Sequence, residues 1–172
     1  MNNTWQLKFF DIYKMRWFSF AALILAASIL QAALPAGWTL KPDLLIISMV
    51  FFSLYYNTSE AIITSFAIGF AADLIGPLMG PAFLGFGITG TLLAYIRHVL
   101  AFRKITFQAA VIFFVSILTG IIISWLSFIK QGQDLYTFRS LFLTALISAV
   151  VGPFLFMPMA LLMRTKSFSL GK

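Results

Sequence analysis

The chain has 172 residues, of which 61% are hydrophobic and only 10% are charged, and its mean hydropathy is +0.98. Soluble domains are about 45–50% apolar and about 25% charged, so this composition excludes an ordinary soluble domain and predicts an all-α integral membrane protein. The net charge of +7 comes from Lys and Arg residues scattered between apolar runs, which argues against nucleic acid as a partner and is typical of cytoplasmic loops.

The first part of the chain predicts a short surface helix followed by a membrane span. On a helical wheel, residues 4–15 separate into a polar and an apolar side, as in a helix that lies on the inner leaflet. The polar side holds Thr4, Lys8, Asp11 and Lys14, and the apolar side holds Trp5, Phe9, Ile12 and Tyr13. An ordinary Lys-flanked lead-in is the alternative. The apolar run at 17–34 is longer than the 7–15 residues of a signal peptide, so we expect it to stay attached as the first span.

Five further apolar runs predict membrane spans at about 43–56, 59–75, 82–100, 107–129 and 138–163. The whole chain, 1–172, is therefore expected to form a single membrane domain with six transmembrane helices. Asn57, followed three positions later by Glu60, predicts a capping box at the start of the third span. Pro42 similarly suits the first turn of the second span, where its missing N–H costs nothing.

The second run is short, about 21 Å at 1.5 Å per residue against a hydrocarbon core of about 30 Å, so a re-entrant segment is an alternative. The distribution of charge favours a short full span. With six spans and both termini in the cytoplasm, most of the Lys and Arg residues lie inside. The inner set is Lys8, Lys14, Arg16, Arg97, Arg103, Lys104, Arg164, Lys166 and Lys172, and the outer set is Lys41, Lys130 and Arg139.

Residue patterns that carry enzymatic chemistry are missing from this sequence. It has no H-E-x-x-H, nucleophile-elbow or Walker pattern, so we predict no catalytic residue, no cofactor and no metal. The single histidine, His98, is interpreted as a structural residue at a helix end, where a cation complements the helix dipole. The glycines at Gly85, Gly87 and Gly90 fall within an apolar helix and are interpreted as packing positions.

Two acidic residues at membrane depth stand out, because ionisable groups there are expensive. Asp43 opens the second span on the outer side, where the helix dipole favours a carboxylate. Asp73 lies near the outer end of the third span, where the dipole of its own helix disfavours one. We therefore expect Asp73 to be compensated by backbone N–H groups of the turn at residues 76–81, by Lys41, or by a donor from a partner.

The residues around these acids carry a resemblance to a known family. Pro42-Asp43 opens a leucine-rich helix, and Gly69 precedes Asp73-Leu74-Ile75-Gly76, Gly80 and Leu84-Gly85. In this arrangement, in its length and in its hydropathy, the chain resembles the rod shape-determining protein MreD family. Where that family often has Ser-Gly after the Asp helix, this chain reads Gly76-Pro77.

The resemblance implies a six-helix fold similar to the S component of vitamin transporters. It also implies a non-catalytic scaffold role in the bacterial cell-elongation machinery, in the cytoplasmic (inner) membrane, in support of peptidoglycan synthesis along the side wall. The implied direct partner is MreC, and through it MreB, the RodA glycosyltransferase and a class B penicillin-binding transpeptidase. Membrane lipid surrounds the chain.

An outer cluster of partner-binding or structural polar residues is expected at this side. It comprises Asp43, Asp73, Gly69, Gly76, Gly80 and Lys41. Two other functions stay open from the residues alone. One is an S component that captures a vitamin or a metal, although few polar outer residues are present to line its pocket. The other is a membrane enzyme acting on lipid-linked sugars, which the absence of paired carboxylates disfavours.

Overall fold

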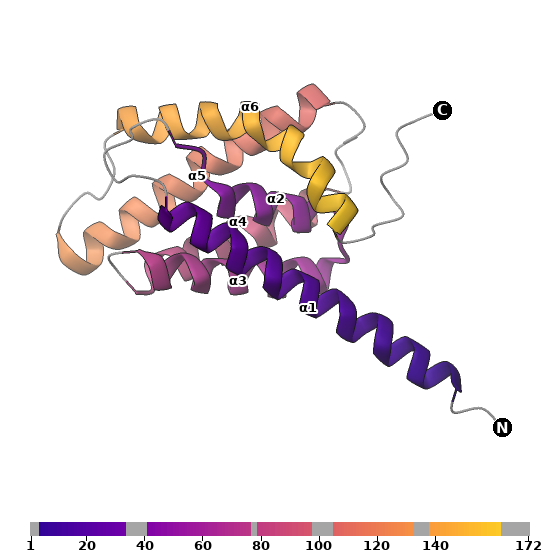
Figure 1. Ribbon diagram of the computed structural model, residues 1–172. Helices are drawn as coiled ribbons and strands as arrows, with labels where there is room; N and C mark the ends of the chain where they lie inside the picture. Colours follow the sequence, from indigo (N-terminus) through magenta and orange to yellow (C-terminus); the bar gives the residue numbers. More distant parts are fainter. Residues whose placement is uncertain (1–3, 34–40, 77–78, 98–104, 133–137, 163–172) are drawn as a thin grey trace.

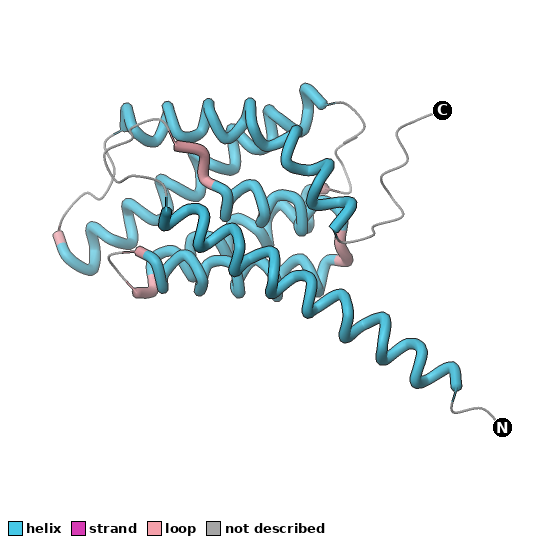
Figure 2. Tube along the Cα trace, viewed as in Figure 1, coloured by secondary structure: helices cyan, strands magenta, loops and turns pink. Residues whose placement is uncertain are grey.

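The computed structural model describes residues 4–33, 41–76, 79–97, 105–132 and 138–162. Within these ranges the chain forms helices and no strands, as the composition predicts (Figures 1 and 2). The helices are α1 (Thr4–Ala33), α2 (Leu44–Tyr55), α3 (Thr58–Ile75), α4 (Pro81–Ile96), α5 (Ile105–Gln131) and α6 (Phe138–Leu162). Their bounds lie close to the predicted spans. The exceptions are α1, which begins at Thr4, and α4, which ends at Ile96 with Arg97 as its C-cap, while residues 98–100 of the predicted span lie outside the described ranges.

The start of the chain differs from the expected division into two helices. The surface helix predicted at 4–15 and the span predicted at 17–34 are joined in one uninterrupted helix of 30 residues, Thr4–Ala33. Figure 1 shows the first part of α1 projecting beyond the other helices. A helix lying flat on the inner leaflet needs a bend before the span, and α1 has no such bend at this junction. The position of residues 4–15 relative to a bilayer therefore stays a prediction.

Successive helices run in opposite directions, so the bundle has two ends. Leu44 N–H at the start of α2 donates to the side-chain oxygen of Gln31 near the end of α1 at 2.9 Å, so these two ends lie side by side. Phe20 in the middle of α1 packs edge-on against Phe52 near the end of α2, with ring centroids 4.8 Å apart. We call the end where α1, α3 and α5 finish the Asp73 end, and the end where α2, α4 and α6 finish the Arg97 end. The start of α1 and the end of α6 both lie at the Arg97 end (Figure 1).

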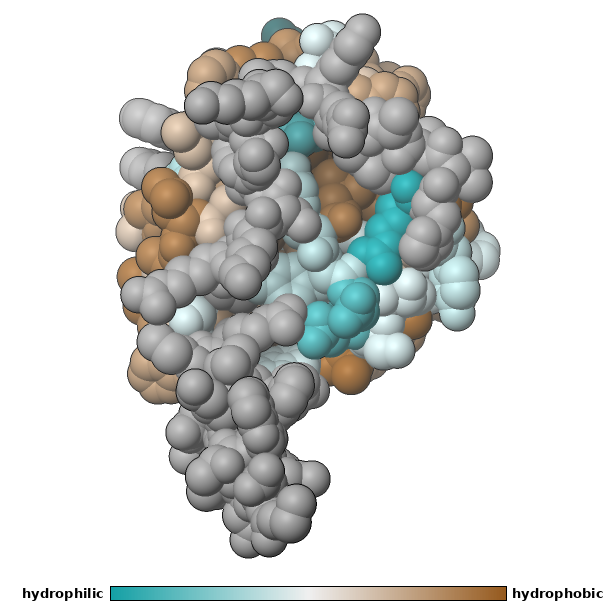
Figure 3. All heavy atoms as spheres, turned by 90° about the vertical axis from the view of Figure 1, so that its right-hand side faces the viewer, coloured by the Kyte–Doolittle hydropathy of each residue, from teal (hydrophilic) through white to brown (hydrophobic). Residues whose placement is uncertain are grey.

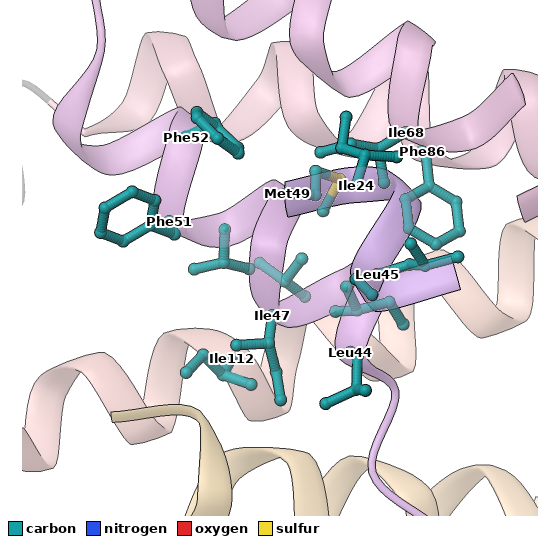
Figure 4. Close-up of a cluster of buried hydrophobic side chains, with 14 of the residues drawn as sticks. Ile24, Leu44, Leu45, Ile47, Met49, Phe51, Phe52, Ile68, Phe86 and Ile112 are labelled. Atoms are coloured by element: carbon teal, nitrogen blue, oxygen red, sulfur yellow. The ribbon is translucent and has the colours of Figure 1, made fainter. Parts of the chain in front are cut away.

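The centre of the bundle is α2, which contacts all five other helices. Its residues 44–53 are all buried, and the side chains of Ile47, Phe51 and Phe52 are fully enclosed (Figure 4). A helix that is hydrophobic all round is a buried helix. This explains the short second run, because at about 18 Å α2 is enclosed by protein along its length and has no lipid-facing side to match to the bilayer.

The outside of the bundle is apolar as well. Three helices, Thr58–Ile75, Thr106–Lys130 and Phe138–Leu162, are long and apolar enough to cross a membrane, and three shorter apolar helices accompany them in the described ranges. Large hydrophobic side chains point outward; Phe18 is 78% exposed and Phe154 is 75% exposed. In water such a surface is unfavourable, and in lipid it is the expected one.

Glycines allow close contacts between helices, as the sequence predicts for the α4 glycines. A Cβ atom on Gly87 would lie 2.2 Å from the ring of Phe66, and one on Gly90 would lie 2.0 Å from the hydroxyl of Ser65. These two contacts bring α4 against α3. Gly120 of α5 is similarly covered by Leu141 of α6. The prediction that small residues allow close approach between helices is confirmed at these positions.

At the starts of α2 and α3 the structure differs from the predicted capping arrangement. Asn57 is the N-cap of α3, but its side chain makes no capping hydrogen bond, so the Asn57 side-chain bond of the predicted capping box with Glu60 is wrong. The start of α2 is at Leu44, and Asp43 is its N-cap, so Pro42 lies just outside the helix instead of in its first turn. In both cases the position of the helix start is close to the prediction.

Candidate functional site

Asp73 is buried, with 4% of its surface exposed, and its carboxylate accepts three backbone hydrogen bonds. Gly80 N–H and Phe83 N–H donate to Oδ2, each at 2.9 Å, and Ala82 N–H donates to Oδ1, also at 2.9 Å. The donors belong to the N-cap and first turn of α4, which is the next helix along the chain. Asp73 is therefore a side-chain cap for the start of α4, supplied from the end of α3.

The residues of the turn complete this cap. Pro81 occupies the first helical position of α4 and has no N–H, so every backbone donor from residue 80 to residue 83 is accounted for. Gly80 has φ = 112°, a left-handed conformation that side chains rarely adopt. This conformation lets the chain turn from α3 into α4 while the Gly80 N–H still points at the carboxylate.

Gly69 lies one turn before Asp73 on α3 and makes room for the backbone of α4. A Cβ atom there would lie 2.8 Å from the carbonyl oxygen of Ala82 and 2.9 Å from the Cα of Phe83. Because these atoms are backbone, a side chain at position 69 would push α4 away from α3. Gly76 is the C-cap of α3, and its N–H donates to the carbonyl of Ala72 at 2.9 Å. Gly69, Asp73, Gly76 and Gly80 thus form one structural unit.

The dipole of α4 offsets the unfavourable effect of the α3 dipole on the Asp73 carboxylate. A carboxylate at the C-terminal end of α3 is repelled by the dipole of α3, but it also lies at the N-terminal end of α4, which attracts it. Of the three compensators considered, backbone donors of the turn and of α4 are present. Lys41 makes no ion pair with Asp73 within the part of the chain that the structure describes. A second cation, Lys130 of α5, donates instead to the carbonyl of Met79 in the same turn.

Asp43 caps a different helix at the same end of the bundle. Its Oδ1 accepts from Leu45 N–H and Ile46 N–H, each at 3.1 Å. The remaining donors of the first turn are taken by other helices. Asp43 N–H donates to the hydroxyl of Ser148 in α6, and Leu44 N–H donates to the side-chain oxygen of Gln31 in α1, each at 2.9 Å. The buried start of α2 is therefore fully hydrogen-bonded.

At the opposite end, Arg97 closes the C-terminus of α2. Its guanidinium donates to the carbonyls of Tyr56 and Ser53, the second at 3.2 Å, and to the hydroxyl of Thr58 at 3.1 Å. A cation is favoured at a helix C-terminus, so Arg97 neutralises the exposed carbonyls of α2 and ties them to the start of α3. Figure 3 views the bundle from this side and shows hydrophilic side chains gathered there, with apolar side chains around them.

Sequence reasoning singled out Asp43 and Asp73 but not Arg97, Gln31 or Ser148. The sequence signal for Arg97 was present, because it is a guanidinium at the end of an apolar helix, but it was used only in the charge count. Nothing in the sequence indicates that Gln31 and Ser148 face α2, since they come from helices far apart in the chain. His98, the other polar residue considered, lies outside the described ranges.

The arrangement is suited to holding helices together. The oxygens of Asp73 and one oxygen of Asp43 accept backbone hydrogen bonds, and the guanidinium of Arg97 donates to carbonyls, so each charge acts on a helix terminus. Among the described residues no group of three His, Cys, Asp or Glu side chains lies close enough to hold a metal ion. Asp43 therefore caps α2, and Asp73 with its three glycines forms a separate cap on α4, while Lys41, half-buried just before α2, belongs to neither cap.

Comparison with known proteins supplies the family. Neither the curated proteins nor the solved structures include a match to this chain, so the likeness to transporter S components is not shown. The family model described as "rod shape-determining protein MreD" matches residues 11–166. This match covers α1 from residue 11 and the whole of the other five helices, and it includes both capping acids and Arg97. The chain therefore belongs to the MreD family of rod shape-determining membrane proteins.

Proposed function

We propose that this chain is a non-catalytic scaffold subunit of the bacterial cell-elongation machinery that binds MreC directly. Through MreC it connects to MreB, RodA and a class B penicillin-binding transpeptidase, in support of peptidoglycan synthesis along the side wall. The observation that carries the proposal is the family match over residues 11–166. The structure supports it in one respect, because the charged groups of Asp73 and Arg97 are engaged in holding the helices together.

The proposed location is the cytoplasmic membrane, with six spans and both termini in the cytoplasm. Alternating helix directions place the start of α1 and the end of α6 at the same end of the bundle (Figure 1). The charge bias assigns this Arg97 end to the cytoplasm. Tyr95, 64% exposed near the Arg97 end, and Trp125, 65% exposed near the Asp73 end, suit the aromatic belts at the two interfaces. Local thinning of the bilayer would accommodate the shorter helices.

Single cysteines test this topology, because the chain has no natural cysteine. Ser59→Cys at the Arg97 end and Met79→Cys at the Asp73 end both replace exposed residues. An impermeant thiol reagent added to intact spheroplasts is expected to label position 79 at once and position 59 only after lysis. The reverse pattern, or labelling of both positions before lysis, would contradict six spans with cytoplasmic termini.

The Asp73 end is the proposed contact region for the juxtamembrane segment of MreC. Its accessible part is the turn around Met79, which is 61% exposed, while Asp73 itself is buried beneath the turn. Asp73, Gly69, Gly76 and Gly80 therefore act on a partner by shaping the turn, and Asp43 by fixing the start of α2. Lys41, half-buried just before α2, is one cation that a partner segment can contact at this end, beside the exposed Lys130 and Arg139.

The deciding experiment is affinity purification of the full-length chain from its own membranes together with co-expressed MreC. The proposal expects MreC to be retained in near-stoichiometric amount and depletion of the chain to round the cells. Rod-shaped cells after clean deletion, or purification with a tightly bound vitamin and no protein partner, would overturn it in favour of the S-component alternative.

A further inference from the structure

Three cations lie at the Asp73 end of the bundle. They are Lys41 before α2, Lys130 in the last turn of α5 and Arg139 in the first turn of α6. Lys130 and Arg139 are exposed, and Lys41 is half-buried. Cations are uncommon in the outer segments of membrane proteins, and the proposed topology assigns this end to the outside. The surroundings of each cation therefore decide whether the chain itself accounts for its position.

The position of Lys130 is accounted for by its own surroundings. Its ammonium donates to the carbonyl of Met79 in the turn before α4, and a cation is favoured in the last turn of a helix. A Cβ atom added to Gly80 of the same turn would lie 3.7 Å from the Lys130 Nζ. The end of α5 thus lies beside the turn that covers Asp73.

Arg139 has the opposite surroundings. It is the second residue of α6, whose first turn contains no acidic side chain. The N-terminal end of a helix carries partial positive charge, so the dipole of α6 disfavours a cation at this position. Within the described ranges no carboxylate forms an ion pair with Arg139, and Asp134, in the segment before α6, lies outside those ranges. No described residue therefore offsets the charge of Arg139.

The two described carboxylates at this end already serve helix starts. Asp73 accepts three backbone hydrogen bonds at the start of α4, and Asp43 accepts two at the start of α2. The charge of Lys41 reaches the Asp43 carboxylate, but the two side chains form no ion pair. The segment that carries Lys41 is tied to α6, because Asp43 N–H donates to the hydroxyl of Ser148. The described part of this end therefore presents an excess of positive charge.

Exposed apolar side chains accompany the cations. Met79, whose carbonyl accepts from Lys130, is 61% exposed, and Phe138, which precedes Arg139, is 74% exposed. Figure 1 shows the end of α5, the start of α6 and the segment before α2 at the same end of the bundle. A protein segment that crosses this end meets cations and apolar side chains together.

Two kinds of anionic partner suit such a surface, namely lipid headgroups around the bundle and an acidic protein segment over its end. Headgroups surround the rim of the bundle. Lys41 is half-buried just before the central helix α2, and Lys130 is directed onto the turn at Met79, so these two cations belong to the end of the bundle as well as to its rim. A protein segment that crosses the end reaches both of them, which favours the protein segment.

We infer that Lys41, Lys130 and Arg139 form a docking surface for an acidic juxtamembrane segment of a single-span partner. The inference rests on the proposed function, which places the juxtamembrane segment of MreC at this end. It adds the chemistry of that segment, which presents carboxylates to the cations, Arg139 above all, and apolar side chains to Met79 and Phe138. Opposite charges of this kind mainly set the orientation of a partner and its rate of association.

Arg139→Glu separates docking from stability in the full-length chain co-expressed with MreC. The dipole of α6 favours a carboxylate in its first turn, so the unfolding midpoint in detergent should stay unchanged or rise. The same change repels an acidic segment, so retained MreC should fall by about fivefold, as for the loss of a strong exposed ion pair. The matched control is Ser59→Glu, at the second and exposed residue of α3 at the Arg97 end, which should leave retention unchanged.

Salt and lipid composition identify the source of the negative charge. Raising the salt concentration from about 0.1 M to about 1 M shortens the screening length from about 10 Å to about 3 Å. MreC retention by the unmodified chain should therefore fall, and retention by the double variant Lys130→Met/Arg139→Glu should change much less. In nanodiscs of phosphatidylcholine alone the loss caused by Arg139→Glu should persist. A loss that needs anionic lipid would mean that headgroups occupy the surface, and would overturn the acidic segment.

The remaining outcomes separate the docking surface from the function. If the unmodified chain retains MreC and Arg139→Glu retains it equally, or if Ser59→Glu loses as much, the docking surface is wrong and the proposed function stands. If the unmodified chain retains no MreC, the two fail together. A second measurement needs no charge variant. A photoreactive phenylalanine analogue at Phe138 should crosslink to an MreC peptide that contains Asp or Glu residues, and a crosslink only to a peptide without them would overturn the inference.

Discussion

The α3–α4 hairpin is held at its two ends by opposite charges that act over different distances in the sequence. Asp73 accepts from backbone groups seven to ten residues further along the chain. Arg97 donates to groups 39 to 44 residues before it. The Asp73 carboxylate joins α3 and α4, which are consecutive in the chain. The Arg97 guanidinium joins α4 to the junction of α2 and α3. Asp73 therefore shapes one turn, and Arg97 fixes the central helix within the bundle.

The two ends also differ in their access to solvent. Asp73 is 4% exposed and the hydrogen bonds that it accepts are part-buried, so water has limited access to the place of a lost acceptor. Arg97 is half-buried at the edge of the bundle, where water and headgroups can serve freed carbonyls. A polar group left without a partner costs most where it is enclosed. The comparison predicts a larger loss at the Asp73 end than at the Arg97 end.

Asp73→Ala is expected to have the largest effect. It leaves three backbone N–H groups of α4 without an acceptor, so the free energy of unfolding should fall by about 3 kcal/mol or more. Asp73→Asn keeps one accepting oxygen and should lose about half as much. Thermal unfolding in detergent and the amount of co-purified MreC measure both variants. Asp11→Ala, far from this turn in the sequence, is the control and should change stability by less than about 0.5 kcal/mol.

Asp73→Asn distinguishes the capping role of Asp73 from a role in acid–base chemistry. If Asp73 were a proton or ion relay, its function would require acid–base chemistry, and Asn would be as damaging to cell shape as Ala. Unchanged stability and cell shape with Asp73→Ala would contradict the capping role altogether.

Arg97→Ala is expected to have the second-largest effect and to lower the free energy of unfolding by about 2 kcal/mol. The variant removes a cation from the C-terminus of α2 and frees the carbonyls of Ser53 and Tyr56, which water at the edge of the bundle can partly serve. Arg97→Lys keeps the charge but not the forked donors, so it should recover only part of the loss. Thr58→Val removes one of the three acceptors and should cost less than either. A loss for Arg97→Ala that equals that of Asp73→Ala would contradict the difference in solvent access.

These two ends also show how far a sequence can be interpreted. The anomaly of Asp73 was visible, because a carboxylate at the end of an apolar helix needs compensation, and its partners lie in the adjacent turn. The helix bounds were similarly accessible, since Pro and Gly separate the apolar runs. The central place of α2 was not, because a short apolar run is equally consistent with a short span. Arg97, Gln31 and Ser148 were missed, because their contacts depend on which helices become neighbours.

Gly69→Ala tests whether the cap depends on close backbone approach. The added Cβ would lie 2.8 Å from the carbonyl of Ala82, so α4 must shift and its hydrogen bonds to Asp73 lengthen. We expect a loss of about 1–3 kcal/mol, as for other overpacked positions. The matched control is Gly132→Ala, where a Cβ atom meets no neighbour within 4 Å and φ is 67°. Its cost of about 1 kcal/mol comes from backbone strain alone. Thermal unfolding measures both variants, and an unchanged or raised unfolding midpoint for Gly69→Ala would show that crowding at position 69 contributes little.

Lys130→Met should have the smallest effect, although its chemistry resembles that of Arg97. The ammonium donates to the carbonyl of Met79 in the Asp73 turn, but Lys130 is exposed and a single flexible cation is easily replaced by water. Methionine keeps most of the apolar length of the side chain, so the variant removes the charge and the donor alone. We expect the unfolding midpoint in detergent to change by about 1 °C or less, within the error of replicate measurements. A loss approaching that of Arg97→Ala would mean that the turn is held from outside by α5, and that Asp73 alone does not fix its conformation.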